Sequence, residues 1–426
     1  MRVLVVGSGG REHALVWKIA RSPKVSGLLA APGSAGISEL AECFPEVAAS
    51  DVPAIVDLAR RERVDLVVVG PEDPLAGGIA DRLNEAGVAV FGPSAAAARL
   101  EASKAFAKAF MKRHQIPTAD YEVFDDVEAA LAYVRGRNRP CVVKADGLAA
   151  GKGVAMCEDA LQAERALREI MQDQRFGDAG SRVVIEEWLR GEEASYYAIT
   201  DGERIVTLAA AQDHKRLLDG DRGENTGGMG AYSPAPVVSQ EVEQKVLDRV
   251  VYPTIRGMAA EGTPYTGVLY VGLMIDDRGD PFVVEFNVRF GDPETQPLMV
   301  RMDGDLVPLL EGAATGRLDE TRRPLWGDAA VCVVLASAGY PRSYEKGKAI
   351  SGLEALPDDD GLVVFHAGTR RAEGGGFETS GGRVLGVTAR GKDVKEARDR
   401  AYAGVEGIDF EGVCCRRDIA ARALAR

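Results

Sequence analysis

The chain has 426 residues, of which 46% are apolar and 27% charged, so it is long enough for about three globular domains. Acidic residues outnumber basic ones by 65 to 52, which gives a formal net charge of -13. This balance argues against a nucleic-acid partner, whose phosphates favour basic surfaces. It does not exclude a phosphorylated small molecule, because a few local lysines and arginines can hold one.

The six cysteines form no C-x-x-C pair, so we expect reduced thiols rather than disulfides or a zinc site. The amino terminus, MRVLVVGSGG, predicts a short strand that enters a glycine turn, not a signal peptide. No apolar run approaches the ~20 residues of a membrane span. We therefore expect a cytoplasmic protein without a membrane or nucleic-acid partner, and we expect it to be a monomer.

The first hundred residues alternate apolar strands with amphipathic helices. This alternation predicts a doubly wound parallel sheet, which binds its ligands outside the carboxyl ends of the strands. The expected strands are 3–6, 64–69 and 88–91, and the expected helices are 11–21 and 80–86.

The pattern changes in the middle of the chain. An alanine-rich stretch over 95–114, closed by Pro117, predicts one helix. Two short strands at 141–144 and 154–156 flank a glycine-rich turn and predict a hairpin, whereas 215–230 is polar and predicts neither helix nor strand. Further strands are expected at 183–185, 268–275 and 282–286, then, after a break near Pro324, at 329–335, 362–365 and 383–387, before a helix at 394–405.

The first glycine turn, Gly7-Ser8-Gly9-Gly10, follows a strand and opens a helix, so its amides and the helix dipole can hold an anion. A dinucleotide fingerprint would need a glycine at position 12, where the chain has Glu12, and the acidic residue expected about 20 positions later is missing. The glycines therefore either serve the turn alone or bind a phosphate that is not part of a dinucleotide; we favour the phosphate.

The second glycine loop, KADGLAAGKG over 144–153, differs from a Walker P-loop. Its glycines are four apart rather than five, Gly153 replaces the residue that would hold magnesium, and the loop leads into a strand. We interpret it as a hairpin tip whose amides fold over phosphates. Lys144 lies in the preceding apolar strand, where an unpaired ammonium is costly. Either a phosphate partner or a sheet edge from which the lysine reaches water explains it.

The strand at 282–289 alternates with period two. Glu285, Asn287 and Arg289 therefore project from one face, with about 7 Å between neighbours. A carboxylate beside an amide oxygen suits magnesium, and the arginine can clamp a carboxylate or an oxyanion. A solvated polar face is the other interpretation. The opposite face, Val284, Phe286 and Val288, is expected to be core.

Eight stretches carry a resemblance that runs in order along nearly the whole chain. The long strings NTGGMGAYSP from Asn225 and EFNVRFGDPETQP from Glu285 are far more specific than any glycine pattern. The chain resembles the ATP-grasp superfamily and, within it, the glycinamide ribonucleotide synthetase (phosphoribosylamine-glycine ligase) family. The other stretches are GSGGREHA from Gly7, GPEDPL from Gly70, KADGLAAGKG from Lys144, GEEAS from Gly191, QDHKR from Gln212 and FHAGT from Phe365.

The resemblance implies a role for each matching position. The implied ATP contacts are Lys104, Lys144, Gly147, Gly151, Lys152, Gly153, Glu186, Glu187, Trp188, Leu189 and Glu193, with 186–189 at the adenine and Glu193 at the ribose hydroxyls. The implied substrate contacts are Gly9 and Gly10 for the phosphoribosyl group and Asp213, Lys215, Arg289 and Asp292 for glycine and the amine. The implied ligands of magnesium (or manganese) are Glu285 and Asn287, and the implied catalytic residues are Lys144, Arg289 and Asp213.

The resemblance also implies three domains. An N-terminal α/β domain over 1–103 would take the phosphoribosyl group, and a two-part ATP-grasp domain over 104–323 would include a small lid at about 121–191. A C-terminal α+β domain would cover 324–426. Two positions depart from the family pattern. The strand at 268–275 lacks an acid that would bind a second metal, and Glu224 stands where proline is expected.

The implied reaction joins glycine to 5-phosphoribosylamine in purine biosynthesis, with ATP converting glycine to glycyl phosphate. It needs no covalent nucleophile of the protein. His13, His114, His214 and His366 are expected to lie far apart, with His214 orienting or structural rather than a proton acceptor. Three alternatives are another ATP-grasp ligase such as a purine-pathway carboxylase or transformylase, a non-catalytic nucleotide-binding protein, and a nicotinamide oxidoreductase, which Glu12 disfavours.

Overall fold

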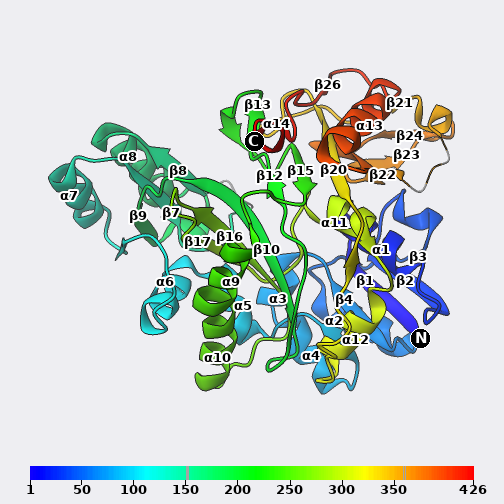
Figure 1. Cartoon of the computed structure of the whole chain (residues 1–426), viewed down its shortest axis with the longest axis horizontal. Coiled ribbons are helices and arrows are strands. Elements are labelled where there is room, and N and C mark those ends of the chain that lie inside the picture. Colours follow the sequence, from blue (N-terminus) through cyan, green and yellow to red (C-terminus); the bar gives the residue numbers. More distant parts are fainter. Residues whose placement is uncertain (150–152, 358, 360) are drawn as a thin grey trace.

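The computed structural model describes residues 1–149, 153–357, 359 and 361–426. Its N-terminal part is a five-stranded parallel sheet in the order β3-β2-β1-β4-β5 (Figure 1), which confirms the predicted doubly wound sheet. The strands are β1 (Arg2–Gly7), β2 (Gly27–Pro32), β3 (Glu42–Cys43), β4 (Leu66–Val69) and β5 (Ala89–Phe91), and the helices are α1 (Gly10–Ile19), η1 (Ile37–Glu39), α2 (Val52–Arg61), α3 (Glu72–Ala76) and α4 (Ile79–Glu85).

Helices cover both faces of this sheet. Along β1, Leu4 and Val6 belong to the same core as α2 and α4, whereas Val3 and Val5 belong to the core that contains α1. Because neither face meets water, the strands are apolar throughout instead of alternating. The glycine turn after β1 therefore lies at the carboxyl edge of the sheet, where α1 begins.

Two helices, α5 (Ala95–Ala102) and α6 (Lys104–Arg113), replace the single helix predicted over 95–114. The prediction was wrong because Ser103 adopts an extended conformation (φ -138°, ψ 111°) and caps α6 by accepting a hydrogen bond from the amide of Phe106. The hydroxyl of Ser103 also donates to Asp146, at 3.1 Å, in the turn after β7 (Cys141–Ala145). The break therefore directs the start of α6 toward the second glycine loop.

A four-stranded antiparallel sheet, β6-β9-β7-β8, with its own apolar core forms the part that projects to one side in Figure 1. The predicted hairpin is confirmed by the pairing of β7 with β8. The strands are β6 (Tyr121–Phe124), β7 (Cys141–Ala145), β8 (Val154–Cys157) and β9 (Val183–Glu187), and the helical segments are α7 (Val127–Arg137), α8 (Ala160–Leu167), η2 (Arg168–Gln172) and η3 (Gly177–Gly180).

The central sheet has the order β11-β10-β16-β17. A β-bulge interrupts β17, because Gly272 pairs with Glu285 while Leu273 pairs with Val283. Val284 is the extra residue, so it lines the main cavity, and its prediction as core was wrong; Phe286 and Val288 are core as predicted. The elements are β10 (Glu192–Thr200), β11 (Ile205–Thr207), β16 (Gly267–Ile275), β17 (Pro281–Asn287), α9 (Gln240–Val246), η4 (Leu247–Val251), α10 (Tyr252–Ala260), α11 (Thr295–Arg301) and α12 (Val307–Ala314).

The segment 215–230, predicted to lack strands, contains a short hairpin of β13 (Arg216–Leu218) and β14 (Arg222–Asn225). Its neighbours β12 (Gln212–Asp213) and β15 (Gly230–Ser233) pair with each other, and β15 joins the edge of the C-terminal sheet through β20 (Ala329–Ser337). Strands β13 and β14 are short and largely solvent-facing, so their sequence shows no apolar alternation.

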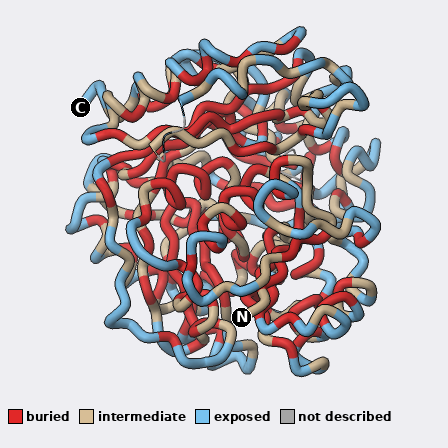
Figure 2. Tube along the Cα trace, turned by 90° about the vertical axis from the view of Figure 1, so that its right-hand side faces the viewer, coloured by how far each residue is buried: buried red, intermediate tan, exposed pale blue. Residues whose placement is uncertain are grey.

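The C-terminal sheet runs β12-β15-β20-β25-β22, with β26 also paired to β20, and α13 packs on it. Figure 2 shows buried residues running continuously through the middle of the trace. Among the described residues, no helix is both long and apolar enough to span a membrane. The remaining elements are β18 (Met302–Asp303), β19 (Leu325–Trp326), β20 (Ala329–Ser337), β21 (Ala349–Ile350), η5 (Leu353–Ala355), β22 (Leu362–His366), β23 (Thr369–Arg371), β24 (Phe377–Thr379), β25 (Arg383–Gly391), α13 (Val394–Glu406), β26 (Val413–Cys414) and α14 (Ala421–Leu424).

Candidate active site

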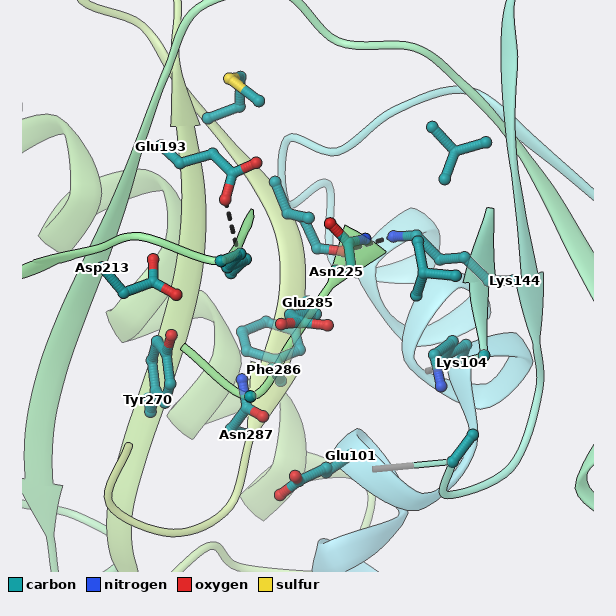
Figure 3. Close-up of a pocket in the computed structure, with 18 of the residues that line it drawn as sticks. Glu101, Lys104, Lys144, Glu193, Asp213, Asn225, Tyr270, Glu285, Phe286 and Asn287 are labelled. Atoms are coloured by element: carbon teal, nitrogen blue, oxygen red, sulfur yellow. Dashed lines mark hydrogen bonds and ion pairs between the residues drawn. The ribbon is translucent and has the colours of Figure 1, made fainter. Parts of the chain in front are cut away.

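A cavity of about 690 Å3 opens where the β6-β9-β7-β8 sheet, the central sheet and the two terminal parts of the chain meet. In Figure 3, Glu285 lies between Asp213 on one side and Lys144 and Lys104 on the other. The described residues predicted as site residues that line it are Lys104, Lys144, Gly153, Glu186, Glu187, Trp188, Leu189, Glu193, Asp213, Lys215, Glu285, Asn287, Arg289 and Asp292. Gly151 and Lys152 lie outside the described residues.

Three buried charged side chains form one wall of the cavity. Glu186 on β9 accepts from Lys144 on β7 at 3.0 Å and is ion-paired with Lys108 on α6 at 2.9 Å. Lys144 also donates to the carbonyl of Val284 at 3.0 Å. Glu186 therefore balances the buried ammonium of Lys144 that the sequence left without a partner. Burial lowers the pKa of Lys108 to about 8.

Lys104 joins the second glycine loop to this wall. Its ammonium donates to the carbonyl of Gly147 at 3.1 Å, and burial lowers its pKa. A side chain at Gly147 would collide with Ala179, because an added Cβ would lie 2.7 Å from the Cβ of that residue. Gly147 is therefore required for the close packing of this turn against Ala179.

Glu285 makes no hydrogen bond or ion pair with any described residue, although it faces several cations. Burial would raise its pKa, but Lys215, Lys144 and Lys104 outweigh burial and lower it. The buried amide nitrogen of Asn287 also has no partner among the described residues. The ionised carboxylate of Glu285 and the amide oxygen of Asn287, which both line the cavity, suit a hard cation, and the unpaired amide N–H of Asn287 can donate to a phosphate oxygen.

Glu193, Lys215 and Asp213 form a second group of charged side chains that line the cavity. Lys215 is ion-paired with Glu193 at 2.8 Å. Burial would lower the pKa of Lys215, but Glu193, Asp213 and Glu285 raise it well above its ordinary value. Burial also raises the pKa of Asp213 to about 7.

Arg289 is held by two carboxylates of the protein. It donates to Glu72 at 3.1 Å and to Glu101 at 2.9 Å. Glu101 also accepts from the amide of Val288 at 2.7 Å, which fixes the chain just after β17. Burial raises the pKa of Glu101 to about 7.

The C-terminal part contributes Arg383 to the same cavity. Arg383 on β25 donates to the carboxylate of Asp292 at 2.8 Å and to the backbone carbonyl of the same residue. Gln296 donates to the other carboxylate oxygen of Asp292, also at 2.8 Å. A Cβ added to Gly10 would lie 2.8 Å from the amide nitrogen of Gln296, so the first glycine turn closely approaches this group.

Glu12 fills the first glycine turn. Its carboxylate accepts from the amide of Gly9 at 2.7 Å, and an added Cβ at Gly7 or Gly70 would collide with the same side chain. The residue that breaks the dinucleotide fingerprint thus occupies the space that a dinucleotide would approach. Gly9 and Gly10 do not line the main cavity but lie beside it, since an added Cβ at either would come within 3.8 Å of Asp292.

The expectation that the four histidines lie far apart was wrong. His13 on α1 and His366 on β22 are neighbours, and the amide of His366 donates to Nδ1 of His13 at 2.9 Å. His214 is buried, and its Nε2 accepts from the amide of Ala420 at 3.0 Å. The hydrogen bond of His214 is consistent with the structural use expected for it.

Sequence reasoning did not identify Lys108, Glu101, Glu294 or Arg383 as members of the site. Glu294 is buried and accepts from Tyr270 at 2.7 Å and from Ser195 at 3.1 Å. Lys108 follows Lys104 by four residues, and this helical spacing was a usable signal that both share one face. All six cysteines are free, in agreement with the expected thiols.

The fold is shared with a solved biotin carboxylase. The biotin carboxylase of Campylobacter jejuni, solved with an ATP analogue, superposes with a TM-score of 0.72 over 97% of this chain and 92% of that one, at 14% identity, which indicates a shared fold alone. The family model of the phosphoribosylglycinamide synthetase ATP-grasp (A) domain matches residues 102–295, and the models of its N and C domains match 1–101 and 330–422. The chain belongs to the phosphoribosylglycinamide synthetase family.

Full-length relatives support this membership. The phosphoribosylamine-glycine ligases of Escherichia coli K12 and Vibrio cholerae are each 52% identical over 427 residues, covering 100% of this chain and 99% of theirs. The crystal structure of phosphoribosylamine-glycine ligase from Thermotoga maritima superposes with a TM-score of 0.84 at 35% identity, covering 98% of this chain and 100% of that one.

Proposed function

We propose that this chain is the ATP-dependent ligase that joins glycine to 5-phosphoribosylamine, giving glycinamide ribonucleotide, ADP and phosphate. One observation carries the proposal beyond family membership: a single cavity joins a lysine-rich wall and the unpartnered carboxylate of Glu285 to a second group of charged residues around Asp213, Arg289 and Asp292. The first group suits a nucleoside triphosphate. The second suits two substrates that between them present a carboxylate and an amine.

The proposed ATP site lies between the lid and the central sheet. Lys104 and Lys144 bind the phosphates, and the loop 147–153, with Gly147, Gly151, Lys152 and Gly153, closes over them. Residues 186–189 border the adenine, and Glu193 accepts from the ribose. The position of Glu186 to Leu189 along one edge of the cavity supports this assignment.

Glu285 and Asn287 are the proposed ligands of Mg2+ (or Mn2+). When bound, the cation would neutralise charge on the β- and γ-phosphates. No group of three or more histidine, cysteine or acidic side chains arranged for a metal ion occurs in the described part of the chain. This suits a cation that takes its other ligands from phosphate and water.

The proposed chemistry makes the glycine carboxylate electrophilic before the amine attacks. A carboxylate oxygen of glycine attacks the γ-phosphorus, the bond to the bridging oxygen breaks, and ADP leaves. Lys144 and the loop amides stabilise the charge of the transferring group, and Arg289 orients glycine. The amine of phosphoribosylamine then displaces phosphate from the glycyl phosphate. Closure of the lid would exclude water, which otherwise hydrolyses the intermediate.

The remaining assignments complete the proposal. Gly9 and Gly10 receive the phosphoribosyl group, while Lys215 and Asp292 line the glycine and amine site. The domain limits are 1–103, 104–323 with a lid at about 121–191, and 324–426. Free cysteines fit a reducing compartment, and we assign the protein to the cytoplasm as a monomer.

A coupled assay for ADP tests the proposal. With freshly generated phosphoribosylamine, ADP formation should require glycine. Bicarbonate and formate, offered in place of glycine, distinguish a carboxylase or a transformylase. ADP release that depends on bicarbonate or formate but is indifferent to glycine would contradict the proposed function, and ATP binding without turnover would indicate a non-catalytic nucleotide-binding protein.

A further inference from the structure

Most carboxylates below the mouth of the cavity already have a donor from the protein. Glu101 accepts from Val288 and Arg289, Asp292 from Arg383 and Gln296, and Glu294 from Tyr270 and Ser195. The other partnered carboxylates are Glu72, Glu186, Glu192, Glu193 and Asp221. Apart from the exposed Glu187, Glu285 and Asp213 are the two carboxylates lining the cavity that, within the described residues, accept no hydrogen bond and form no ion pair.

The two carboxylates differ in electrostatic environment. Three lysines lower the pKa of Glu285, so it stays ionised and suits a metal ion. Burial, together with the charges of Glu294 and Glu193, raises the pKa of Asp213 to about 7, although the cations Lys215 and Arg422 oppose this change. Lys215 is itself committed to Glu193. A carboxylate that is about half protonated at neutral pH can accept and release a proton during turnover.

The main chain holds Asp213 firmly at this place. Asp213 pairs with Ala231 between β12 and β15, and its carbonyl accepts from Arg422. Its carboxylate points into the cavity beside Tyr270 and faces the region of Glu285 (Figure 3). Together with Glu193 and Glu285 it raises the pKa of Lys215, so these three carboxylates lie around that lysine.

The amide-forming step needs a group of this kind. The nitrogen of phosphoribosylamine forms a bond with the carbonyl carbon of glycyl phosphate, and the bond from that carbon to the phosphate oxygen breaks, with the electron pair leaving on phosphate. The nitrogen must lose one proton for the neutral amide to form. A base whose pKa lies near the working pH accepts this proton most efficiently.

His214, the residue after Asp213, does not serve as this acceptor. Its ring is buried, and Nε2 already accepts from the amide of Ala420. Burial lowers the pKa of His214 to about 3, so it is a poor proton acceptor at neutral pH. The neighbouring carboxylates Glu193 and Asp292 are held by Lys215 and Arg383.

We infer that a carboxylate oxygen of Asp213 takes the proton from the amine nitrogen of phosphoribosylamine as the amide bond forms. This inference rests on the proposed function. It assigns to Asp213 a role in the second half-reaction, after glycine has been phosphorylated, and it separates Asp213 from the residues that bind glycine.

Kinetics of Asp213→Asn test the role. We expect kcat to fall by about 100-fold or more, while KM for glycine and for ATP changes less than about threefold. Asp213→Ala should be equally slow and should regain activity when formate is added, because a small carboxylate can occupy the emptied position. A large rise in KM for glycine with kcat preserved would overturn the inference and make Asp213 a ligand of the glycine ammonium. Failure of formate to restore any activity would also count against it.

Stability gives an independent readout. The pKa of Asp213 is raised from 3.8 to about 7. Between these two pH values the folded state binds more protons than the unfolded state. The free energy of unfolding of wild type therefore decreases as pH rises from about 4 to about 7. Asp213→Asn removes this cost, so its melting temperature should exceed that of wild type at pH 8 and the difference should vanish near pH 4. A lower melting temperature at pH 8 would show that Asp213 is a structural residue.

Asp201→Asn is the matched control, because Asp201 lies outside the cavity and accepts from Arg204 and from the amides of Glu203 and Leu318. It should lower the melting temperature and leave both kinetic constants within about twofold. If wild type itself forms no ADP with glycine and phosphoribosylamine, the proposed function fails. If wild type and Asp213→Asn are equally active, the inference about Asp213 fails alone.

Discussion

At the scale of single residues, Glu285 has no hydrogen-bond or ion-pair partner among the described residues, yet three lysines lie near its carboxylate. Lys215, Lys144 and Lys104 lower its pKa, yet none of them forms an ion pair with it. Each of the three lysines has another acceptor, namely Glu193, Glu186 and the carbonyl of Gly147. The side chain is therefore ionised and available to a cation that arrives with the nucleotide.

Glu285→Gln should weaken binding of Mn2+ in the presence of ATP by about tenfold or more, since losing even an outer-shell partner of a metal costs that much. The affinity can be measured by electron paramagnetic resonance of free Mn2+. Glu224→Gln, on the surface beside Arg342, serves as the control and should bind Mn2+ as wild type does. Equal affinity in Glu285→Gln and wild type would refute the metal assignment.

Sequence periodicity predicts residues that share one strand but not residues that meet from different elements. Glu285 and Asn287 follow from period two. The bulge that turns Val284 into the cavity has no such signal. Sequence periodicity also does not predict that Glu101 and Arg383 belong to the site. Their partners, Arg289 and Asp292, are 188 and 91 residues away along the chain. Only packing brings such pairs together.

At the scale of elements, helix α1 and strand β22 meet at a pair of histidines. Nδ1 of His13 accepts from the amide of His366, whose own Nδ1 lies 2.9 Å from the hydroxyl of Thr369. Burial, reinforced by His366, lowers the pKa of His13 from 6.5 to about 3. Both rings are therefore neutral in the folded protein, and protonation of His13 would remove the acceptor that joins the two elements.

This joint predicts acid sensitivity. Below pH 6.5 His13 is protonated in the unfolded chain but stays neutral in the folded protein. Its contribution to the free energy of unfolding is therefore fully present above pH 6.5 and is lost as pH falls toward 3. Each such histidine contributes a slope of up to about 1.4 kcal/mol per pH unit. The pKa values of His214 and His366 are also lowered, to about 3 and about 4, so they add to the slope.

His13→Asn should make this acid dependence shallower, because an asparagine oxygen can accept from His366 without titrating. Urea denaturation between pH 4.5 and 7 measures the slope. His13→Ala, which also removes the acceptor, should be less stable than wild type at pH 7. An unchanged slope in His13→Asn would contradict the account of this joint.

The elements that sequence predicts well are the apolar ones. Strands β1, β4 and β5 of the N-terminal sheet, β16 and β17 of the central sheet, and the hairpin of β7 and β8 follow from apolar runs and turn residues, whereas β2 and β10 were not predicted. The break at Ser103 was missed because the alanine-rich stretch favours helix on both sides of it, and the cap decides the boundary. The hairpin of β13 and β14 was missed because it packs little apolar surface and its residues resemble a loop.

At the scale of the whole molecule, the two ends of the chain complete a cavity built on the middle. Arg11 and Glu72 of the N-terminal part line it together with Arg383 and Arg422 of the C-terminal part. The sequence predicted three domains in this order, but the meeting of all three at one site follows only from the structure. We propose that glycine is activated by phosphorylation in this shared cavity before the amine of phosphoribosylamine attacks its carbonyl carbon.

Transfer of an oxygen isotope tests this claim most directly. Glycine labelled with 18O in both carboxylate oxygens is supplied with ATP and phosphoribosylamine, and the inorganic phosphate is analysed by mass spectrometry. Activation through glycyl phosphate predicts one 18O in each phosphate released and one in the amide product. Phosphate free of label, with turnover intact, would contradict the account.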